Sequence, residues 1–250
     1  MPLLSQQAGL DLPAPVTDDG VAREVLAHGA VEVIGRMPWS SNATFLTEVT
    51  LGDDALIAIY KPQAGERPLW DFAEGTLCRR EVGAYVLSDL LGWALVPHTV
   101  LRDDAPYGLG ALQRFVDHDP DEHYFELQES GERVDVFRRF AVFDIVANNT
   151  DRKGGHLLLG EDGHVWGIDH GVCFHRQWKL RTVIWEYAGE PVPQALLDAV
   201  ECVPARLDAF ADLLSPPELE ALIARAERLL KTRRFPLQSG DYRDYPWPMV

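Results

Sequence analysis

The sequence predicts an α+β fold with two lobes, an antiparallel sheet in the first lobe and mainly helices in the second. Short apolar and alternating runs, which are typical of strands, are concentrated before residue 116. Apolar residues then recur at helical spacing through most of the second half of the chain. We therefore predict an N-terminal arm at residues 1–24, a sheet lobe at 25–116 and a helical lobe at 117–250.

The elements of the first lobe follow from local patterns. Five segments carry the runs expected of strands: residues 31–34, 44–49, 56–60, 96–100 and 111–116. The turn residues 52–54 join the second and third of these into an antiparallel meander. A helical pattern covers residues 76–91 and ends at Gly92. The acidic residues 117–123 are placed as a crossing between the lobes.

The second lobe begins with a helical pattern at residues 136–147, followed by a hairpin at 157–168. A closing helix is predicted from Ser215, whose side chain can cap it together with Glu218 three positions later. The tail at residues 241–250 holds three aromatic residues among prolines. Because this composition is too aromatic for a solvent spacer, we expect the tail to pack against the protein.

The overall composition excludes several classes of partner. The 250 residues are 46% hydrophobic and 25% charged, as in an ordinary globular protein. A net charge of −16 repels phosphate backbones and anionic lipids, so we expect no nucleic acid partner. We find no signal peptide and no apolar run of membrane-spanning length, and expect no stable membrane anchor. Cys78, Cys173 and Cys202 are widely separated, which favours the reducing cytoplasm.

Two carboxylates carry the strongest functional signal. Asp151 lies in a polar loop behind an apolar helix pattern, and Asp169 ends a strand 18 positions later, directly before His170 and Gly171. In a kinase active site the first Asp orients the attacking hydroxyl and the second holds the magnesium ion that bridges the nucleotide phosphates. The alternative for Asp151 is a simple turn cap, whereas an unpaired Asp169 would cost several kcal/mol to bury.

A lysine and a glutamate that could serve nucleotide binding come before the two aspartates in the sequence. Lys61 ends the third predicted strand, and Glu81 lies on a largely apolar stripe of the helix that follows. Pairing the two would satisfy both charges and aim the ammonium group at a nucleotide phosphate. The alternatives are a solvated lysine at a strand end and a glutamate that neighbours Arg79 or Arg80.

Three further groups of residues are weaker candidates. The loop between the first two strands could offer Ser41, Asn42 and Thr44 to phosphate oxygens, although an ordinary turn uses the same residues. A cationic island of Arg176, Lys179 and Arg181 could gather an anionic substrate or the nucleotide phosphates, or could be a solvated helix face. Four histidines crowd the region from 156 to 175, but without the regular spacing of a zinc site.

In this order the motifs resemble the phosphatidylinositol 3- and 4-kinase-like branch of the protein-kinase-like superfamily, especially the type II phosphatidylinositol 4-kinases and their bacterial relatives. The similar segments are residues 81–87, 95–99, 113–116, 149–152 and 168–174. The resemblance implies a two-lobed protein-kinase-like fold that binds ATP between the lobes.

The resemblance also implies roles for individual residues. Lys61 would contact the α and β phosphates, with Glu81 as its anchor. Gln113 would belong to the hinge, and backbone groups near Phe115 and Val116 would hold adenine. Asp151, in the catalytic Asp151–Arg152 pair, would position or deprotonate the acceptor hydroxyl, and Asp169 would bind Mg²⁺. His156 stands where the family usually has an asparagine metal ligand, which puts metal number or preference in question and admits Mn²⁺.

We therefore expect an ATP- and Mg²⁺-dependent phosphotransferase that acts on a hydroxyl of a soluble small molecule or protein. The acceptor itself is not encoded in any motif. The cysteine cluster that such lipid kinases use for palmitoylation is absent from this chain, which counts against a lipid acceptor. Two alternatives remain open from the sequence: a nucleotide-binding regulatory module without transfer, and an enzyme that transfers AMP.

Overall fold

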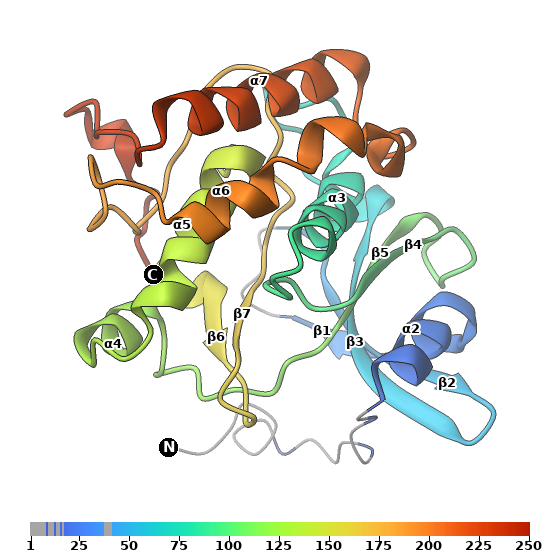
Figure 1. The fold of residues 1–250 in the computed structure, drawn as a ribbon. Helices are drawn as coiled ribbons and strands as arrows, with labels where there is room; N and C mark the ends of the chain where they lie inside the picture. The colour runs from blue at the N-terminus through green and yellow to red at the C-terminus, as the bar shows by residue number, and fades with distance from the viewer. Residues whose placement is uncertain (1–8, 10–12, 14–15, 17, 38–41) are drawn as a thin grey trace.

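The structure is a computed structural model, which describes residues 9, 13, 16, 18–37 and 42–250. The first lobe holds a five-stranded antiparallel sheet with strand order β1-β2-β3-β5-β4 (Figure 1). Its strands are β1 (Ala30–Arg36), β2 (Phe45–Leu51), β3 (Asp54–Pro62), β4 (Thr99–Arg102) and β5 (Gly110–Arg114). The predicted antiparallel sheet is therefore confirmed, and all five predicted strand segments overlap an observed strand.

Helices α2 (Asp19–His28) and α3 (Leu77–Leu90) flank this sheet. Successive residues of a strand face opposite sides, so Tyr60 packs in the cluster with α2 while Lys61 faces α3. The prediction that residues 19–24 belong to an arm is wrong, because they form most of α2. The helix is short and buries only three side chains, so tertiary packing, rather than a long periodic pattern, stabilises it.

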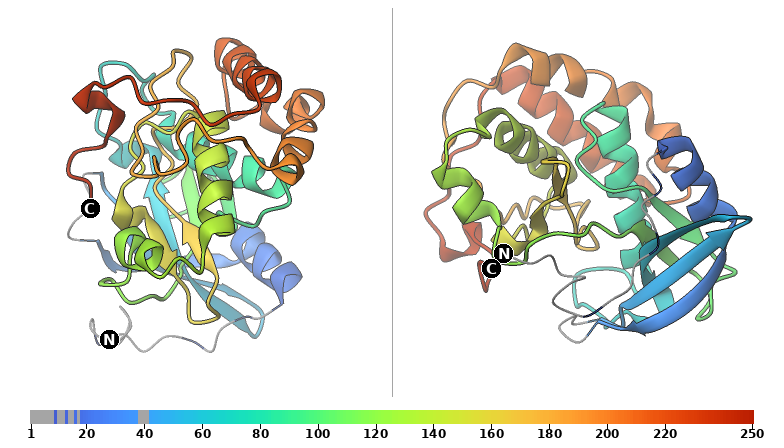
Figure 2. Two further views of the ribbon diagram at one scale, coloured as in Figure 1. Left: turned by 60° about the vertical axis from the view of Figure 1, so that its left-hand side comes forward. Right: turned by 90° about the horizontal axis from the view of Figure 1, so that it is seen from below.

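The second lobe is mainly helical, as predicted, and its core surrounds α5 (Figures 1 and 2). Its helices and strands are α4 (Tyr124–Glu129), α5 (Val134–Ala147), β6 (Leu157–Leu159), β7 (Val165–Gly167), α6 (Gln194–Val200) and α7 (Pro216–Thr232). One short 3₁₀ turn, η1 (Gln63–Gly65), lies in the first lobe. The second lobe holds four: η2 (Gly154–His156), η3 (Val203–Ala205), η4 (Leu207–Phe210) and η5 (Tyr242–Asp244). Among the described residues, no helix is both long and apolar enough to cross a membrane.

Helix α7 begins at the predicted capping box and fastens α3 to the second lobe. The Ser215 hydroxyl and peptide N–H both donate to the Glu218 carboxylate at 2.8 Å. Glu218 also forms an ion pair with Arg80 of α3, and Arg80 donates to the Cys173 carbonyl oxygen at 2.7 Å. Because Arg80 is buried, these contacts fix α3, and with it Glu81, relative to the second lobe.

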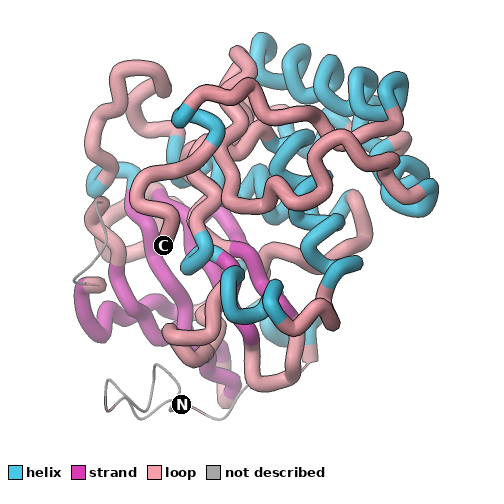
Figure 3. Tube along the Cα trace, turned by 90° about the vertical axis from the view of Figure 1, so that its left-hand side faces the viewer, coloured by secondary structure: helices cyan, strands magenta, loops and turns pink. Residues whose placement is uncertain are grey.

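The C-terminal tail contacts the second lobe, as predicted, but it does so through its backbone, because the side chains of Tyr242 and Trp247 are exposed. The Asp244 carbonyl oxygen accepts hydrogen bonds from the Thr182 peptide N–H and the Trp185 indole N–H, both at 3.1 Å. The Met249 carbonyl oxygen accepts one from the Gly154 peptide N–H at 2.7 Å. Figure 3 shows the tail running over the loops of this lobe and ending in front of the sheet.

Candidate active site

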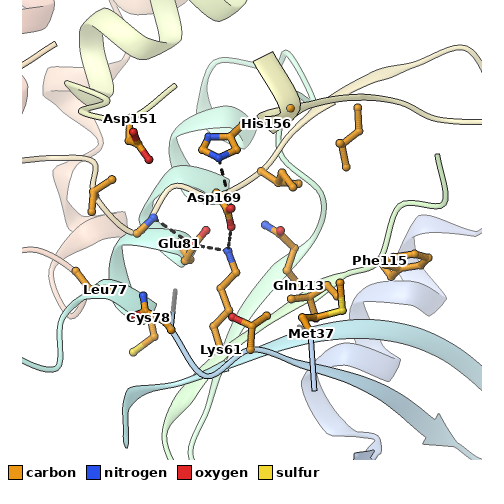
Figure 4. Close-up of a pocket in the computed structure, with 18 of the residues that line it drawn as sticks. Met37, Lys61, Leu77, Cys78, Glu81, Gln113, Phe115, Asp151, His156 and Asp169 are labelled. Atoms are coloured by element: carbon orange, nitrogen blue, oxygen red, sulfur yellow. Dashed lines mark hydrogen bonds and ion pairs between the residues drawn. The ribbon is translucent and has the colours of Figure 1, made fainter. Parts of the chain in front are cut away.

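A cavity of about 540 Å³ lies between the two lobes and collects most of the predicted site residues. The sheet lobe contributes Lys61 from β3 and Glu81 from α3, and the helical lobe contributes Asp151 and Asp169 (Figure 4). These residues are far apart in the sequence. The fold therefore brings the lysine, the glutamate and both carboxylates to one hollow, as the spacing of the motifs predicted.

Lys61 lies between two carboxylates. Its Nζ atom is 2.7 Å from Glu81 Oε1 and 2.5 Å from Asp169 Oδ1. Burial alone would lower the pKa of Lys61, but Asp169 and Glu81 outweigh this and hold the pKa above its ordinary value. The ammonium group of Lys61 in turn lowers the pKa of Asp169 well below its usual range. Both groups are therefore charged at neutral pH.

Glu81 also fixes the turn that carries Asp169. Its carboxylate accepts hydrogen bonds from the peptide N–H groups of His170 at 3.0 Å and Gly171 at 3.1 Å. Asp169 itself has a φ of +58°, a left-handed conformation that few residues other than glycine adopt readily. The turn thus presents Asp169 toward the cavity, where 51% of its side chain is exposed.

Asp151 is held in the loop after α5 with its carboxylate open to the cavity. The Asp151 peptide N–H donates to Asn149 Oδ1 at 3.0 Å, and Asn149 is itself buried and bonded to Asp144. Burial raises the pKa of Asp151 to about 6, although the nearby ammonium group of Lys153 opposes this shift. A carboxylate with this pKa is ionised at pH 7 and still able to take a proton, which suits a general base.

The structure corrects the assignment of Arg152 as a catalytic residue. Its side chain is 0% exposed and pairs with the equally buried Asp144 at 2.9 Å. It also donates to the Ile168 carbonyl oxygen at 3.2 Å and lies 2.7 Å from Nε2 of His170. Arg152 cannot touch a substrate. It is a positioning residue that ties the loop of Asp151 to the turn of Asp169.

His156 lies beside Asp169 but is poorly arranged as a metal ligand. Its Nδ1 accepts the Lys153 peptide N–H at 3.3 Å, which places the ring hydrogen on Nε2, 3.6 Å from Asp169 Oδ2. Burial lowers the pKa of His156 to about 4, so the ring is neutral. In this tautomer Nε2 points a hydrogen, rather than a lone pair, toward Asp169.

The oxygen chemistry of Asp169 nevertheless fits magnesium. Within the described part of the chain, no cluster of three or more His, Cys, Asp or Glu side chains is arranged to hold a metal. Mg²⁺ commonly binds one or two carboxylates and completes its shell with phosphate oxygens and water. A half-exposed Asp169 can therefore serve a nucleotide-bound Mg²⁺ without a cage of protein ligands, whereas His156 in its present tautomer cannot.

The residues predicted to bind nucleotide mostly line the cavity. Those that do so are Asn42, Thr44, Gln113, Phe115 and Val116, together with Lys61 and Glu81. Ser41 lies outside the described residues. The Gln113 side chain is buried and donates to Thr99 Oγ1 at 2.9 Å, so it stiffens the junction of β4 and β5. The peptide N–H of Phe115 donates to the carbonyl oxygen of Ile57, which fixes the segment after β5 to β3.

The structure does not bring the three residues of the predicted cationic island together at the cavity. None of the side chains of Arg176, Lys179 and Arg181 lines the cavity. Lys179 pairs with Asp71 at 2.7 Å, which neutralises its charge, and Arg176 is exposed. Arg181 alone is close enough to Asp151 to oppose the rise of its pKa.

Two of the residues that line the cavity but were not predicted as site residues are Lys153 and Val250. Lys153 lines it, with Nζ 3.7 Å from Asp151 Oδ2. The position of Lys153, two residues after Asp151, was a signal that could have identified it. Val250 at the end of the tail also lines the cavity. No local pattern could have revealed this, because the contact depends on how the tail crosses the second lobe.

Comparison with known proteins identifies the family to which the chain belongs. The family model for phosphatidylinositol 3- and 4-kinases matches residues 98–207, which include Asp151 and Asp169. A rice phosphatidylinositol 4-kinase gamma 4 (Oryza sativa subsp. japonica) is 32% identical over 135 residues, covering 46% of this chain and 23% of that protein. The chain belongs to the phosphatidylinositol 3- and 4-kinase-like family. The phosphatidylinositol 4-kinase gamma 3 of Arabidopsis thaliana is 28% identical, over 61% of this chain and 33% of the plant protein.

This family member therefore spans only a quarter to a third of those plant kinases. It matches Protein Rv2133c of Mycobacterium tuberculosis (strain ATCC 25618 / H37Rv) along nearly its whole length, with 42% identity over 90% of this chain and 94% of that protein. Among solved structures, the Helicobacter pylori proinflammatory kinase CtkA superposes with a TM-score of 0.50 at 13% identity, covering 83% of this chain and 94% of CtkA. That likeness supports the two-lobed kinase-like fold.

Proposed function

We propose that the protein transfers a phosphoryl group from Mg²⁺-bound ATP to a hydroxyl group of a soluble small molecule or protein. The observation that carries this proposal is the position of Lys61 between Glu81 and Asp169, in one cavity with the accessible Asp151. We place the activity in the cytoplasm, because all three cysteines are unpaired thiols.

Each side chain has a role that follows from its place. Lys61 is charged and directed into the cavity, where it would bind the α and β phosphates. Asp169 would hold Mg²⁺, which supplies compensation for the charge on the transferring phosphoryl group. Asp151 would accept a hydrogen bond from the acceptor hydroxyl and take its proton, and Lys153 would bind an oxygen of the transferring group. Positioning and electrostatic stabilisation supply most of the rate in such a site.

His156 favours a second candidate, a nucleotide-binding module without transfer. An imidazole that presents a hydrogen to Asp169 supplies no second oxygen ligand, and a site with one metal ligand fewer could bind ATP unproductively. Transfer of AMP would use the same residues. The mass added to the product separates a phosphoryl group from AMP.

The test combines product mass spectrometry with nucleotide binding. Wild-type protein, Mg²⁺ and ATP are incubated with panels of sugars, polyols, amino acids and peptides. We expect Asp151→Asn to lower kcat by about 100-fold or more while it leaves Mg²⁺–ATP affinity within about twofold. Asp53→Asn, in the exposed turn between β2 and β3, is the matched control and should keep full activity. ATP binding without any product, in wild type, would favour the regulatory module.

A further inference from the structure

The C-terminal tail lies along the surface that surrounds Asp151. Residues 181–183 run beside the catalytic loop, because the Arg152 peptide N–H donates to the Arg181 carbonyl and the Val183 N–H donates to the Arg152 carbonyl. The tail then covers the outer side of this segment through the two hydrogen bonds to the Asp244 carbonyl oxygen. A strip of backbone next to the catalytic carboxylate is thus already occupied by the chain itself.

The tail is built into this place rather than loosely attached. Pro246 is buried, and the Asp244 carboxylate accepts hydrogen bonds from the Ser239 hydroxyl at 2.8 Å and the Gly240 peptide N–H at 3.0 Å. Farther on, the Met249 carbonyl is bonded to Gly154 of the catalytic loop. A side chain at Gly154 would come within 3.4 Å of that carbonyl oxygen, so the two backbones approach closely.

The tail borders the active-site cavity without filling it. Val250 is one of the residues that line the cavity, and the nearest atom to a Cβ placed on Gly155 is a Val250 methyl group at 3.9 Å. Yet 37% of the Asp151 side chain and 51% of the Asp169 side chain stay exposed. Both carboxylates are therefore reachable by a small molecule while the tail is docked. The tail behaves as a wall, not as a plug.

We propose that residues 241–250 are a steric filter that admits low-molecular-weight hydroxyl compounds to Asp151 and excludes polypeptide acceptors. An extended polypeptide needs a continuous strip of free surface on either side of its reacting hydroxyl, and the strip at residues 181–185 carries the tail. A compound the size of a sugar or polyol needs only the open mouth of the cavity. The inference rests on the proposed function and narrows its acceptor class to small molecules.

A labelling experiment tests the filter without relying on catalysis. Asp151→Cys is introduced together with Cys202→Ser, which leaves only the buried Cys78 and Cys173 as native thiols. One sample keeps the tail, and a second ends after residue 240. Each is labelled with iodoacetamide, and separately with a maleimide on a peptide of about 15 residues, which is about 50 Å long when extended. The Cys202→Ser protein without Asp151→Cys gives the background.

We expect removal of the tail to speed peptide–maleimide labelling by about tenfold or more and to change iodoacetamide labelling by less than about twofold. An equal rise for both reagents would make the tail a plug, and no rise for either would make it irrelevant; both results overturn the filter. If the shortened chain exposes Cys78 or Cys173, the comparison uses the full-length chain with Pro246→Gly and Trp247→Gly, which loosens the tail. A filter confirmed by labelling, in a protein that phosphorylates nothing, would refute the proposed function alone.

Discussion

Replacement of Arg152 by methionine tests the corrected role of this residue. The side chains of Arg152 and Asp144 are both 0% exposed, and three contacts of 2.9–3.2 Å join the guanidinium group to the carboxylate. Methionine fills much of the volume but leaves Asp144 charged and buried, and among the described residues its remaining side-chain partners are the Asn149 amide and the Thr182 hydroxyl. Breaking a buried ion pair in this way costs about 3–5 kcal/mol.

The assay is urea unfolding followed by tryptophan fluorescence, with Arg23→Met as the matched control. Arg23 pairs with Asp89 at 3.4 Å, but both side chains are more than half exposed, so its loss should cost less than about 1 kcal/mol. For a chain of this size, the loss at Arg152 corresponds to a fall in Tm of about 10 °C. A loss below about 1 kcal/mol in Arg152→Met would refute the structural role. Adding Asp144→Leu should restore part of the stability, because no unpaired charge then remains.

Three further predictions concern catalysis and the fold. Because the pKa of Asp151 is about 6 and the ionised form is the base, kcat/KM should be level above pH 7 and should fall by roughly tenfold per pH unit below pH 5; a profile flat to pH 4.5 would contradict this. Glu81→Gln should weaken Mg²⁺–ATP binding by about tenfold in calorimetry, since Lys61 loses one anchor, whereas Glu227→Gln on the exposed face of α7 should not. Ser215→Ala should lower the free energy of unfolding by about 1 kcal/mol in urea titration, and an unchanged midpoint would count against the capping box.

The parts of the fold that the sequence predicted correctly have local causes. The turn at residues 52–54 and the capping box at Ser215 are set by residues next to one another in the chain, and the structure confirms both. The short helices α2, α4 and α6 were not predicted. They span 10, 6 and 7 residues, too few for a periodic pattern to stand out, and they depend on the core they pack against.

The same distinction holds for the site. Lys61, Glu81 and Asp169 could be found because each sits at a recognisable position in a strand, a helix or a turn. The role of Arg152 could not, because it depends on the burial of Asp144, which lies on α5 and meets Arg152 only after the chain has turned. The pairing of Lys179 was equally hidden from the sequence, since its partner, Asp71, lies in the other lobe. The place of the tail likewise depends on contacts between distant segments.

Calorimetric titration of ATP, with and without Mg²⁺, tests the central claim most directly. The wild-type protein should bind ATP more tightly when Mg²⁺ is present, by about tenfold. Asp169→Asn should lose this difference, and Lys61→Met should bind ATP weakly under both conditions. Affinity that is independent of Mg²⁺, or unchanged in both variants, would contradict the account that Lys61 and Asp169 grip the phosphates and metal of one nucleotide.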